Sequence, residues 1–133
     1  MKYLVDSDWL IDYLGNNPEA IRLLQQLYDD GIALSVISYM EALEGIRRVG
    51  RAVASTQQGM LEAFELLDVT PIVARRCATL RETLRLQGKR VNQRSLDLLI
   101  AATALEYDLT LVTRNLRDYQ DIPDLKLLQQ GVA

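Results

Sequence analysis

Residues 95–107 read Ser-Leu-Asp-Leu-Leu-Ile-Ala-Ala-Thr-Ala-Leu-Glu-Tyr, and a second apolar run, Thr-Leu-Val-Thr, follows at 110–113. The first run is apolar on nearly every side of a helix, which is typical of a helix packed inside a protein. The second run is short and mostly apolar, which is typical of a buried parallel strand. Asp97 is the exception within the buried helix, because a desolvated carboxylate needs a partner. A buried helix that leads into a buried strand indicates an α/β fold.

Four further runs share the short apolar pattern of a buried strand. They are Lys2–Val5, Ala33–Ser38, Leu66–Val69 and the weaker Leu125–Leu128. Apolar residues at helical spacing lie between them, once after Pro18 and once between Pro71 and Gly88, residue types that favour helix starts and helix ends. Right-handed crossovers between such strands produce a parallel sheet covered on both faces. We therefore expect a single domain over 1–133 with a three-layer α/β/α fold and a central parallel sheet of about five short strands.

The composition excludes several classes of site. The 133 residues include no histidine, which removes Ser-His-Asp catalysis and imidazole metal ligands. The single cysteine, Cys77, excludes an internal disulfide and a cysteine-rich metal centre. The remaining carboxylates are hard oxygen donors, so a bound metal is expected to be Mg²⁺ or Mn²⁺. Asp6 interrupts the chain before a signal peptide could form, and no apolar run approaches the ~20 residues of a membrane span, so we expect a cytoplasmic protein without membrane association.

Four acidic residues are expected near the carboxyl ends of the strands, where open α/β sheets bind their ligands. They are Asp6, Glu41, Asp97 and Asp118. Clustered carboxylates repel one another and raise their pKa values unless a cation lies between them. A divalent metal ion is therefore the simplest explanation for the four acids together.

Each acid also has a structural interpretation. Ser38 and Glu41 fit a capping box at the start of a helix, if the second strand ends at Ser38. Asp97 near a helix start is favoured by the helix dipole, and Asp6 could form an Asx-turn at the end of its strand. Asn115 and Asp118 could likewise cap a short helix, so both interpretations stay open at this point.

Four stretches resemble the successive motifs of PIN-domain nucleases. They are Tyr-Leu-Val-Asp-Ser-Asp-Trp-Leu-Ile-Asp at 3–12, Ile-Ser-Tyr-Met-Glu-Ala-Leu-Glu-Gly at 37–45, Asp-Leu-Leu-Ile-Ala-Ala-Thr-Ala-Leu at 97–105 and Leu-Val-Thr-Arg-Asn-Leu-Arg-Asp-Tyr at 111–119. Their order and spacing resemble the VapC-type toxins of toxin–antitoxin pairs. The resemblance implies an endoribonuclease that depends on Mg²⁺ or Mn²⁺, a small antitoxin partner and a homodimer.

The resemblance also implies roles for individual residues. Asp6, Glu41, Asp97 and Asp118 correspond to the catalytic and metal-binding acids, and Thr113 and Asn115 to polar supports of the pocket. Asp8 stands where many relatives carry Asn, and either caps the first helix, which we favour, or adds an outer carboxylate. Glu44 competes with Glu41 because it lies one helical turn further along, but Glu41 matches the motif better. Tyr119 stands where relatives often have Phe.

A basic segment is expected to contact the RNA backbone. Residues 75–94 contain seven basic residues and one acid, a local net charge of +6, so the remainder of the chain carries −9 against a total of −3. The basic residues are Arg75, Arg76, Arg81, Arg85, Lys89, Arg90 and Arg94. Such asymmetry suits phosphate contacts beside an acidic pocket. The alternative is an ordinary solvated helix face.

Two other functions fit parts of the pattern. The Asp-Ser-Asp at 6–8 resembles the motif of haloacid-dehalogenase-like phosphatases, but none of the three lysines is placed to complete such a site. A PIN-like module that binds RNA or protein without catalysis is the second alternative, and the intact carboxylates argue against it.

Overall fold

Four short strands form a parallel sheet in the order β3-β2-β1-β4, in a computed structural model that describes residues 1–48 and 55–128. The strands are β1 (Tyr3–Val5), β2 (Ile32–Ser35), β3 (Glu65–Leu67) and β4 (Thr110–Val112). The α-helices are α1 (Ser7–Leu14), α2 (Pro18–Tyr28), α3 (Val36–Arg48), α4 (Ser55–Glu62), α5 (Pro71–Leu86) and α6 (Ser95–Glu106). There are also two 3₁₀ helices. η1 (Asn92–Arg94) directly precedes α6, and η2 (Leu116–Asp118) follows β4.

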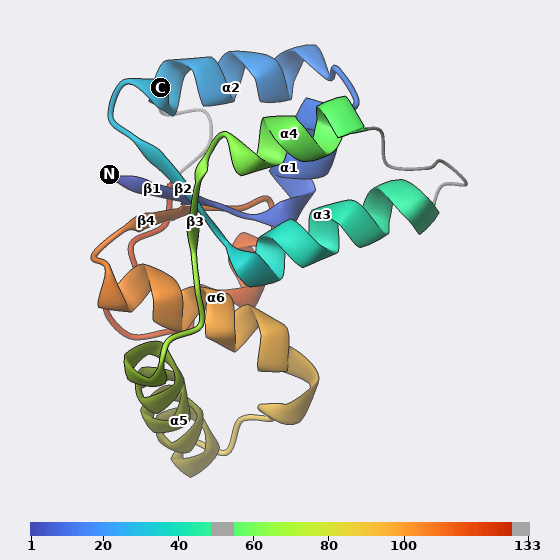
Figure 1. The fold of residues 1–133 in the computed structure, drawn as a ribbon. Helices are drawn as coiled ribbons and strands as arrows, with labels where there is room; N and C mark the ends of the chain where they lie inside the picture. The colour runs from blue at the N-terminus through green and yellow to red at the C-terminus, as the bar shows by residue number, and fades with distance from the viewer. Residues whose placement is uncertain (49–54, 129–133) are drawn as a thin grey trace.

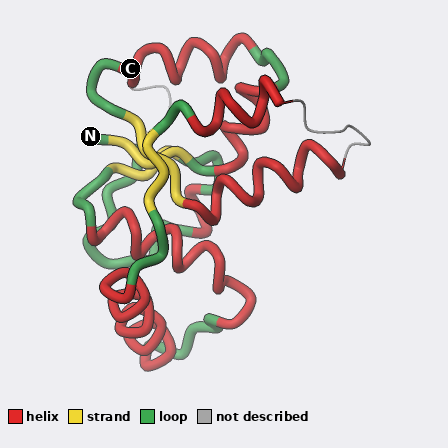
Figure 2. The backbone as a smooth tube through the Cα atoms, viewed as in Figure 1, coloured by secondary structure: helices red, strands yellow, loops and turns green. Residues whose placement is uncertain are grey.

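Helices cover both faces of the sheet, which confirms the three-layer α/β/α expectation (Figures 1 and 2). Leu4 and Leu111 point toward α5 and α6 and join one buried apolar cluster. Their neighbours in sequence, Val5 and Val112, join the second cluster, formed with α1 to α4. This alternation follows from the two-residue period of a strand, and it explains why the strands are apolar on both sides.

The helix boundaries follow the expected local signals. α2 begins at Pro18, where the Asn17 side chain accepts from the Ala20 N–H at 3.1 Å. α5 begins at Pro71 and ends before Gly88, whose φ of 80° suits glycine. Within the described ranges no helix has the length and apolarity needed to cross a membrane.

The expected strand over 33–38 is wrong in its second half. β2 ends at Ser35, whose hydroxyl accepts from the Ile37 N–H at 3.0 Å and turns the chain directly into α3. Ser38 and Glu41 therefore both lie inside a helix that begins at Val36. The capping-box interpretation of Glu41 is wrong, because Ser38 is not the first residue of a helix.

The sheet has four strands instead of about five. The segment expected over 125–128 meets β4 at one bridge only, between Leu111 and Leu127. The expected strand over 66–69 is also shorter, since β3 ends at Leu67 and Thr70 already caps α5 through the Val73 N–H at 3.2 Å.

The strand order has one switch point at the carboxyl end of the sheet, the position where α/β sheets form a ligand-binding crevice. From β1 the chain proceeds to β2 and β3 on one side and then returns to β4 on the other. The carboxyl ends of β1 and β4 therefore lie side by side at the switch point, where α/β sheets bind ligands. Asp6 follows β1 directly, and its N–H donates to the Val112 carbonyl of β4 at 2.9 Å.

Candidate active site

Asp6 lies at the base of this crevice with only 4% of its surface exposed. Its Oδ1 accepts from the Ser7 N–H at 2.8 Å, so Asp6 caps α1. Its Oδ2 accepts from the Thr113 hydroxyl at 2.8 Å. Burial and the neighbouring Asp8 charge raise the pKa of Asp6, against the opposing effect of these hydrogen bonds.

Asp97 reaches the same crevice from the third residue of α6. The Tyr119 hydroxyl lies 3.1 Å from Oδ1 of Asp97 and 3.4 Å from Oδ2 of Asp6, and so stands between the two carboxylates. Burial among carboxylates raises the pKa of Tyr119 far above its usual value, so the hydroxyl keeps its proton and acts as a donor. Partial burial and the charges of Asp6 and Asp118 raise the pKa of Asp97.

Glu41 approaches from α3 on the other side of the sheet. Its Oε1 accepts from the Ser7 hydroxyl at 3.2 Å, which ties α3 to the first turn of α1. Burial raises the pKa of Glu41, and the negative charges of Asp6 and Asp97 raise it further. Glu41 is therefore close enough to Asp6 and Asp97 for their charges to change its pKa.

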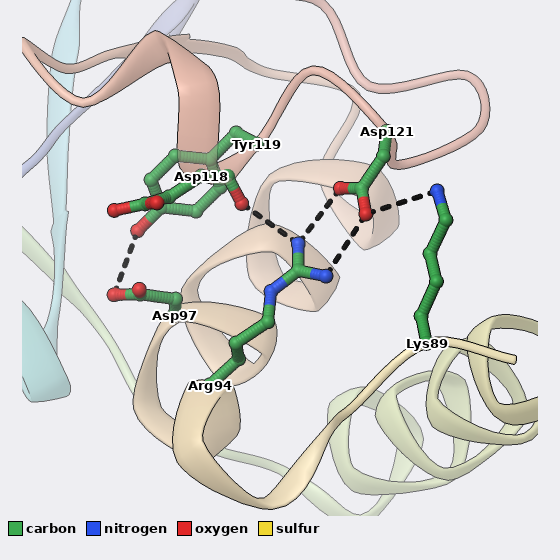
Figure 3. Close-up of polar contacts among 6 residues, drawn as sticks. All are labelled: Lys89, Arg94, Asp97, Asp118, Tyr119 and Asp121. Atoms are coloured by element: carbon green, nitrogen blue, oxygen red, sulfur yellow. Dashed lines mark hydrogen bonds and ion pairs between the residues drawn. The ribbon is translucent and has the colours of Figure 1, made fainter.

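Asp118 completes the group from η2. The residue is exposed, and its negative charge contributes to the raised pKa of Asp97. Figure 3 shows the Asp118 carboxylate on the same side of Arg94 as the Asp97 carboxylate. The fold thus brings the four acids expected from the sequence to one place.

The donors in this group suit a hard divalent cation. All are oxygens, and the pKa values of Asp6, Glu41 and Asp97 are raised first by burial and then by neighbouring negative charges, whose repulsion a cation would relieve. Across 1–48 and 55–128, no three acidic side chains are arranged to hold one ion by themselves. Mg²⁺ is commonly bound through one or two carboxylates and several waters, so a partly hydrated ion is compatible with this arrangement.

The two expected polar supports lie differently. Thr113 is buried, donates to Asp6 and accepts from the Asn115 N–H at 3.1 Å. Asn115 is exposed, and its side chain makes no capping hydrogen bond to η2. The alternative in which Asn115 serves as a helix cap is therefore wrong.

Asp8 does not cap the first helix, contrary to the expectation from the sequence, because Asp6 occupies the cap position. Asp8 Oδ1 accepts from the Trp9 N–H at 2.7 Å, and Oδ2 accepts from the Arg114 N–H at 3.0 Å. It therefore ties α1 to the loop after β4. Glu44 forms an exposed ion pair with Arg48 at 2.7 Å, and its negative charge contributes to the raised pKa of Glu41.

Most of the basic segment is engaged in contacts within the protein. Arg76 pairs with Glu106 and Arg85 with Glu82, both at 2.8 Å. Arg81 donates to the carbonyl of Val91 and to the side chains of Asn92 and Ser95. Lys89 and Arg94 both bind Asp121.

Arg75 and Arg90 differ from these, because each is exposed and has no ion pair within the described residues. They are the residues of the segment whose charge is available to a phosphate without breaking an internal contact.

Three contacts of the site were missed at the level of sequence. Ser7 and Tyr119 each sit next to a predicted acid, so their adjacency to Asp6 and Asp118 was the available signal. Asp121 had no such signal, because its partners Lys89 and Arg94 lie 32 and 27 residues away.

Comparison with known proteins identifies the family. The model of the PIN domain family matches residues 3–125. The chain belongs to the PIN-domain family. Ribonuclease VapC19 of Mycobacterium tuberculosis (strain H37Rv) is 32% identical over 127 residues, covering 92% of this chain and 96% of the relative. The tRNA(fMet)-specific endonuclease VapC of Salmonella typhimurium is 27% identical over 129 residues, covering 96% of both.

A solved structure supports the same family relationship. VapBC2 from Rickettsia felis, bound to a DNA fragment from its promoter, contains a chain that matches this PIN domain with a TM-score of 0.79 at 25% identity. The match covers 96% of this chain and 98% of the other. Against the haloacid-dehalogenase alternative, the three lysines contact Tyr3, Asp121 and Asp108 instead of the acidic group.

Proposed function

We propose that this protein is a divalent-metal-dependent endoribonuclease that hydrolyses phosphodiester bonds of RNA. The proposal rests on the meeting of four carboxylates at the switch point of the sheet, one directly after β1 and the others on α3, α6 and η2. In this proposal Asp6, Glu41, Asp97 and Asp118 are the catalytic and metal-binding residues. The ribonuclease relatives, matched over nearly their whole length, support the same activity.

The proposed ion is Mg²⁺ or Mn²⁺, held directly by Asp6 and Asp97. Glu41 and Asp118 would contact a second ion or the water ligands of the first. When bound, such an ion supplies an acidified water and positive charge that offsets the charge developing on the phosphate oxygens. Thr113 holds the Asp6 carboxylate in place through its hydrogen bond. The Asn115 side chain makes no helix-capping hydrogen bond to η2.

The chain's own residues would then move the proton of hydrolysis. The Ser7 hydroxyl fixes Oε1 of Glu41 and leaves Oε2 without a hydrogen bond to any described residue. Glu41 would take the proton of the water that attacks phosphorus, while the bond from phosphorus to the leaving nucleotide oxygen breaks. Its raised pKa suits this role as a general base.

RNA would be held by the basic segment. We propose phosphate contacts from Arg75, Arg76, Arg81, Arg85 and Arg90, of which Arg75 and Arg90 have side chains with no hydrogen bond or ion pair to a described residue. Replacing Arg75 and Arg90 together by Gln should weaken RNA binding. The slope of log affinity against log salt concentration should fall by the equivalent of about two phosphate contacts. An unchanged salt dependence would remove these two residues from the RNA interface.

The proposed partner is a small antitoxin that covers the acidic crevice with a basic side chain, and the proposed assembly is a homodimer. The structural neighbour from Rickettsia felis is a VapBC2 complex, which supports such a pairing. Co-expression of the small neighbouring reading frame should relieve growth arrest caused by this protein. Growth arrest that the neighbour does not relieve would contradict the pairing.

The activity is tested by incubating total RNA with the purified protein in Mg²⁺, Mn²⁺ or EDTA and sequencing the fragment ends. Asp97→Asn is the test variant, and Asp108→Asn is the matched control, because it removes an acid that pairs with Lys126 away from the crevice. Discrete cuts in metal that Asp97→Asn abolishes and Asp108→Asn retains are expected. RNA binding without cleavage would support the binding module, and hydrolysis of phosphomonoesters would support the phosphatase.

A further inference from the structure

The strongest ion pair near the crevice joins Arg94 to Asp121. Two guanidinium nitrogens of Arg94 donate to the two carboxylate oxygens of Asp121, at 2.7 and 2.9 Å. Lys89 donates to the same carboxylate at 3.1 Å. Both Arg94 and Asp121 are about four-fifths buried, with 21% and 23% of their side chains exposed. Two-pronged pairs of this kind are among the most geometrically specific contacts in proteins.

The same guanidinium also holds the backbone of Asp118. Nη2 of Arg94 donates to the Asp118 carbonyl at 2.7 Å, and the Asp118 N–H donates to the Asn115 carbonyl at 3.0 Å. Arg94 immediately precedes α6, three residues before Asp97. One side chain therefore connects the start of α6 to η2, as Figure 3 shows.

The buried Tyr119, next to Asp118, adds a second link through its hydroxyl to Asp97, but it makes no hydrogen bond to the Asp118 carboxylate. η2 is three residues long, and the Asp118 carboxylate makes no hydrogen bond or ion pair with any described residue. Asp97 and Asp118 repel each other, since each carries a negative charge in the same crevice. Without a cross-link, this repulsion would favour a larger separation between the two carboxylates.

We propose that Arg94, held by Asp121, is a positioning residue that keeps the Asp118 carboxylate beside Asp97. This inference rests on the proposed function, because it concerns the arrangement of the proposed metal-binding acids. It also gives Arg94 and Lys89 a different role from the phosphate contacts expected from the sequence.

The two roles predict opposite effects of Asp121→Asn. If Arg94 and Lys89 bind RNA phosphates, loss of the competing carboxylate frees both cations, so RNA binding tightens and kcat is unchanged. If Arg94 positions Asp118, the same change loosens η2, so kcat and metal affinity fall while KM for RNA stays near its original value. Arg94→Lys keeps the charge but loses the two-pronged contact, so it separates geometry from charge.

The experiment measures kcat and KM for RNA cleavage and, independently, Mn²⁺ affinity by calorimetry. The proteins are wild type, Asp121→Asn, Arg94→Lys, the double variant and the control Asp108→Asn. We expect about tenfold losses of kcat and of Mn²⁺ affinity in each single variant, because residues that orient metal ligands contribute about 10–100-fold. The double variant should lose no more than either single variant, and the control should match wild type.

Wild-type values of kcat and Mn²⁺ affinity in Arg94→Lys and Asp121→Asn would overturn the positioning role, as would tighter RNA binding in Asp121→Asn. If Asp121→Asn fails to fold by circular dichroism, Arg94→Lys decides the question. A wild-type protein that neither binds Mn²⁺ nor cleaves RNA would instead overturn the proposed function, so the two failures are distinguishable.

Discussion

The Tyr119 hydroxyl lies 3.1 Å from Oδ1 of Asp97, within a crevice that brings negative charges together. Tyr119 is 1% exposed, so its hydroxyl proton does not face solvent. The hydroxyl donates to the carboxylates around it. A neutral donor in this position offsets part of the repulsion between carboxylates, in the space where a cation would do so more strongly.

Tyr119→Phe should destabilise the metal-free protein. The change retains the buried ring and removes the donor, and the loss of a hydrogen bond to a charged group costs roughly 1.5–3 kcal/mol. The free energy of unfolding in urea with EDTA measures this effect. A variant as stable as wild type in EDTA would show that the hydroxyl does not relieve repulsion among the acids.

Thr113→Val should destabilise the protein through Asp6. Valine has nearly the same shape, but it leaves a buried carboxylate oxygen without its 2.8 Å donor, at a cost of roughly 1–3 kcal/mol. Thr113→Ser keeps the hydroxyl and should recover most of the loss. Equal stabilities of the valine and serine variants in thermal unfolding would contradict this role for the hydroxyl.

The metal-free protein should lose stability as pH rises above the ordinary carboxyl range. Burial raises the folded-state pKa values of Asp6, Glu41 and Asp97 above the ordinary values of 3.8 for Asp and 4.5 for Glu. Between the unfolded and folded pKa values the folded state binds more protons, so the free energy of unfolding falls with pH. Asp121 contributes in the opposite sense, because Arg94 lowers its pKa.

Asp97→Asn isolates this effect, since the amide does not titrate. In EDTA, the free energy of unfolding of Asp97→Asn relative to wild type should increase as pH rises from about 4, and then level off. A difference that is constant with pH would mean that the pKa of Asp97 is the same in the folded and unfolded states.

Ser7→Ala should shift the pH dependence of cleavage. The Ser7 hydroxyl lowers the pKa of Glu41, so its removal raises that pKa and moves the acidic limb of the kcat profile to higher pH. The measurement is the pH–rate profile at saturating RNA and Mg²⁺. An acidic limb at the wild-type position would exclude Glu41 as the proton acceptor.

Much of the fold could be predicted from local patterns. The four apolar residues Val73, Cys77, Leu80 and Leu84 are all buried, as their spacing after Pro71 predicts. The end of β2 could not be predicted in this way, because 33–38 is continuously favourable for a strand and a single hydroxyl, that of Ser35, turns the chain into α3.

In the candidate site, too, some positions could be predicted from local sequence patterns and others depend on contacts between distant residues. Asp6 could be placed at the carboxyl edge of the sheet because it follows a strand, whereas Thr113 was expected in the pocket only from the resemblance to PIN-domain nucleases. The positions of Tyr119 and Asp121 depend instead on contacts 22 and 27 residues away in the chain, with Asp97 and Arg94. The expectation that Arg94 contacts RNA came from a local count of positive residues, which cannot include its ion pair with Asp121, 27 residues further along the chain.

Titration of the purified protein with Mn²⁺ in a calorimeter measures whether Asp6 and Asp97 form a divalent-metal site. Wild type and the Asp108→Asn control should bind Mn²⁺ with the same affinity, and Asp6→Asn and Asp97→Asn should each weaken binding by at least about tenfold. Equal Mn²⁺ affinity in wild type, Asp6→Asn and Asp97→Asn would contradict the metal site and the mechanism built on it.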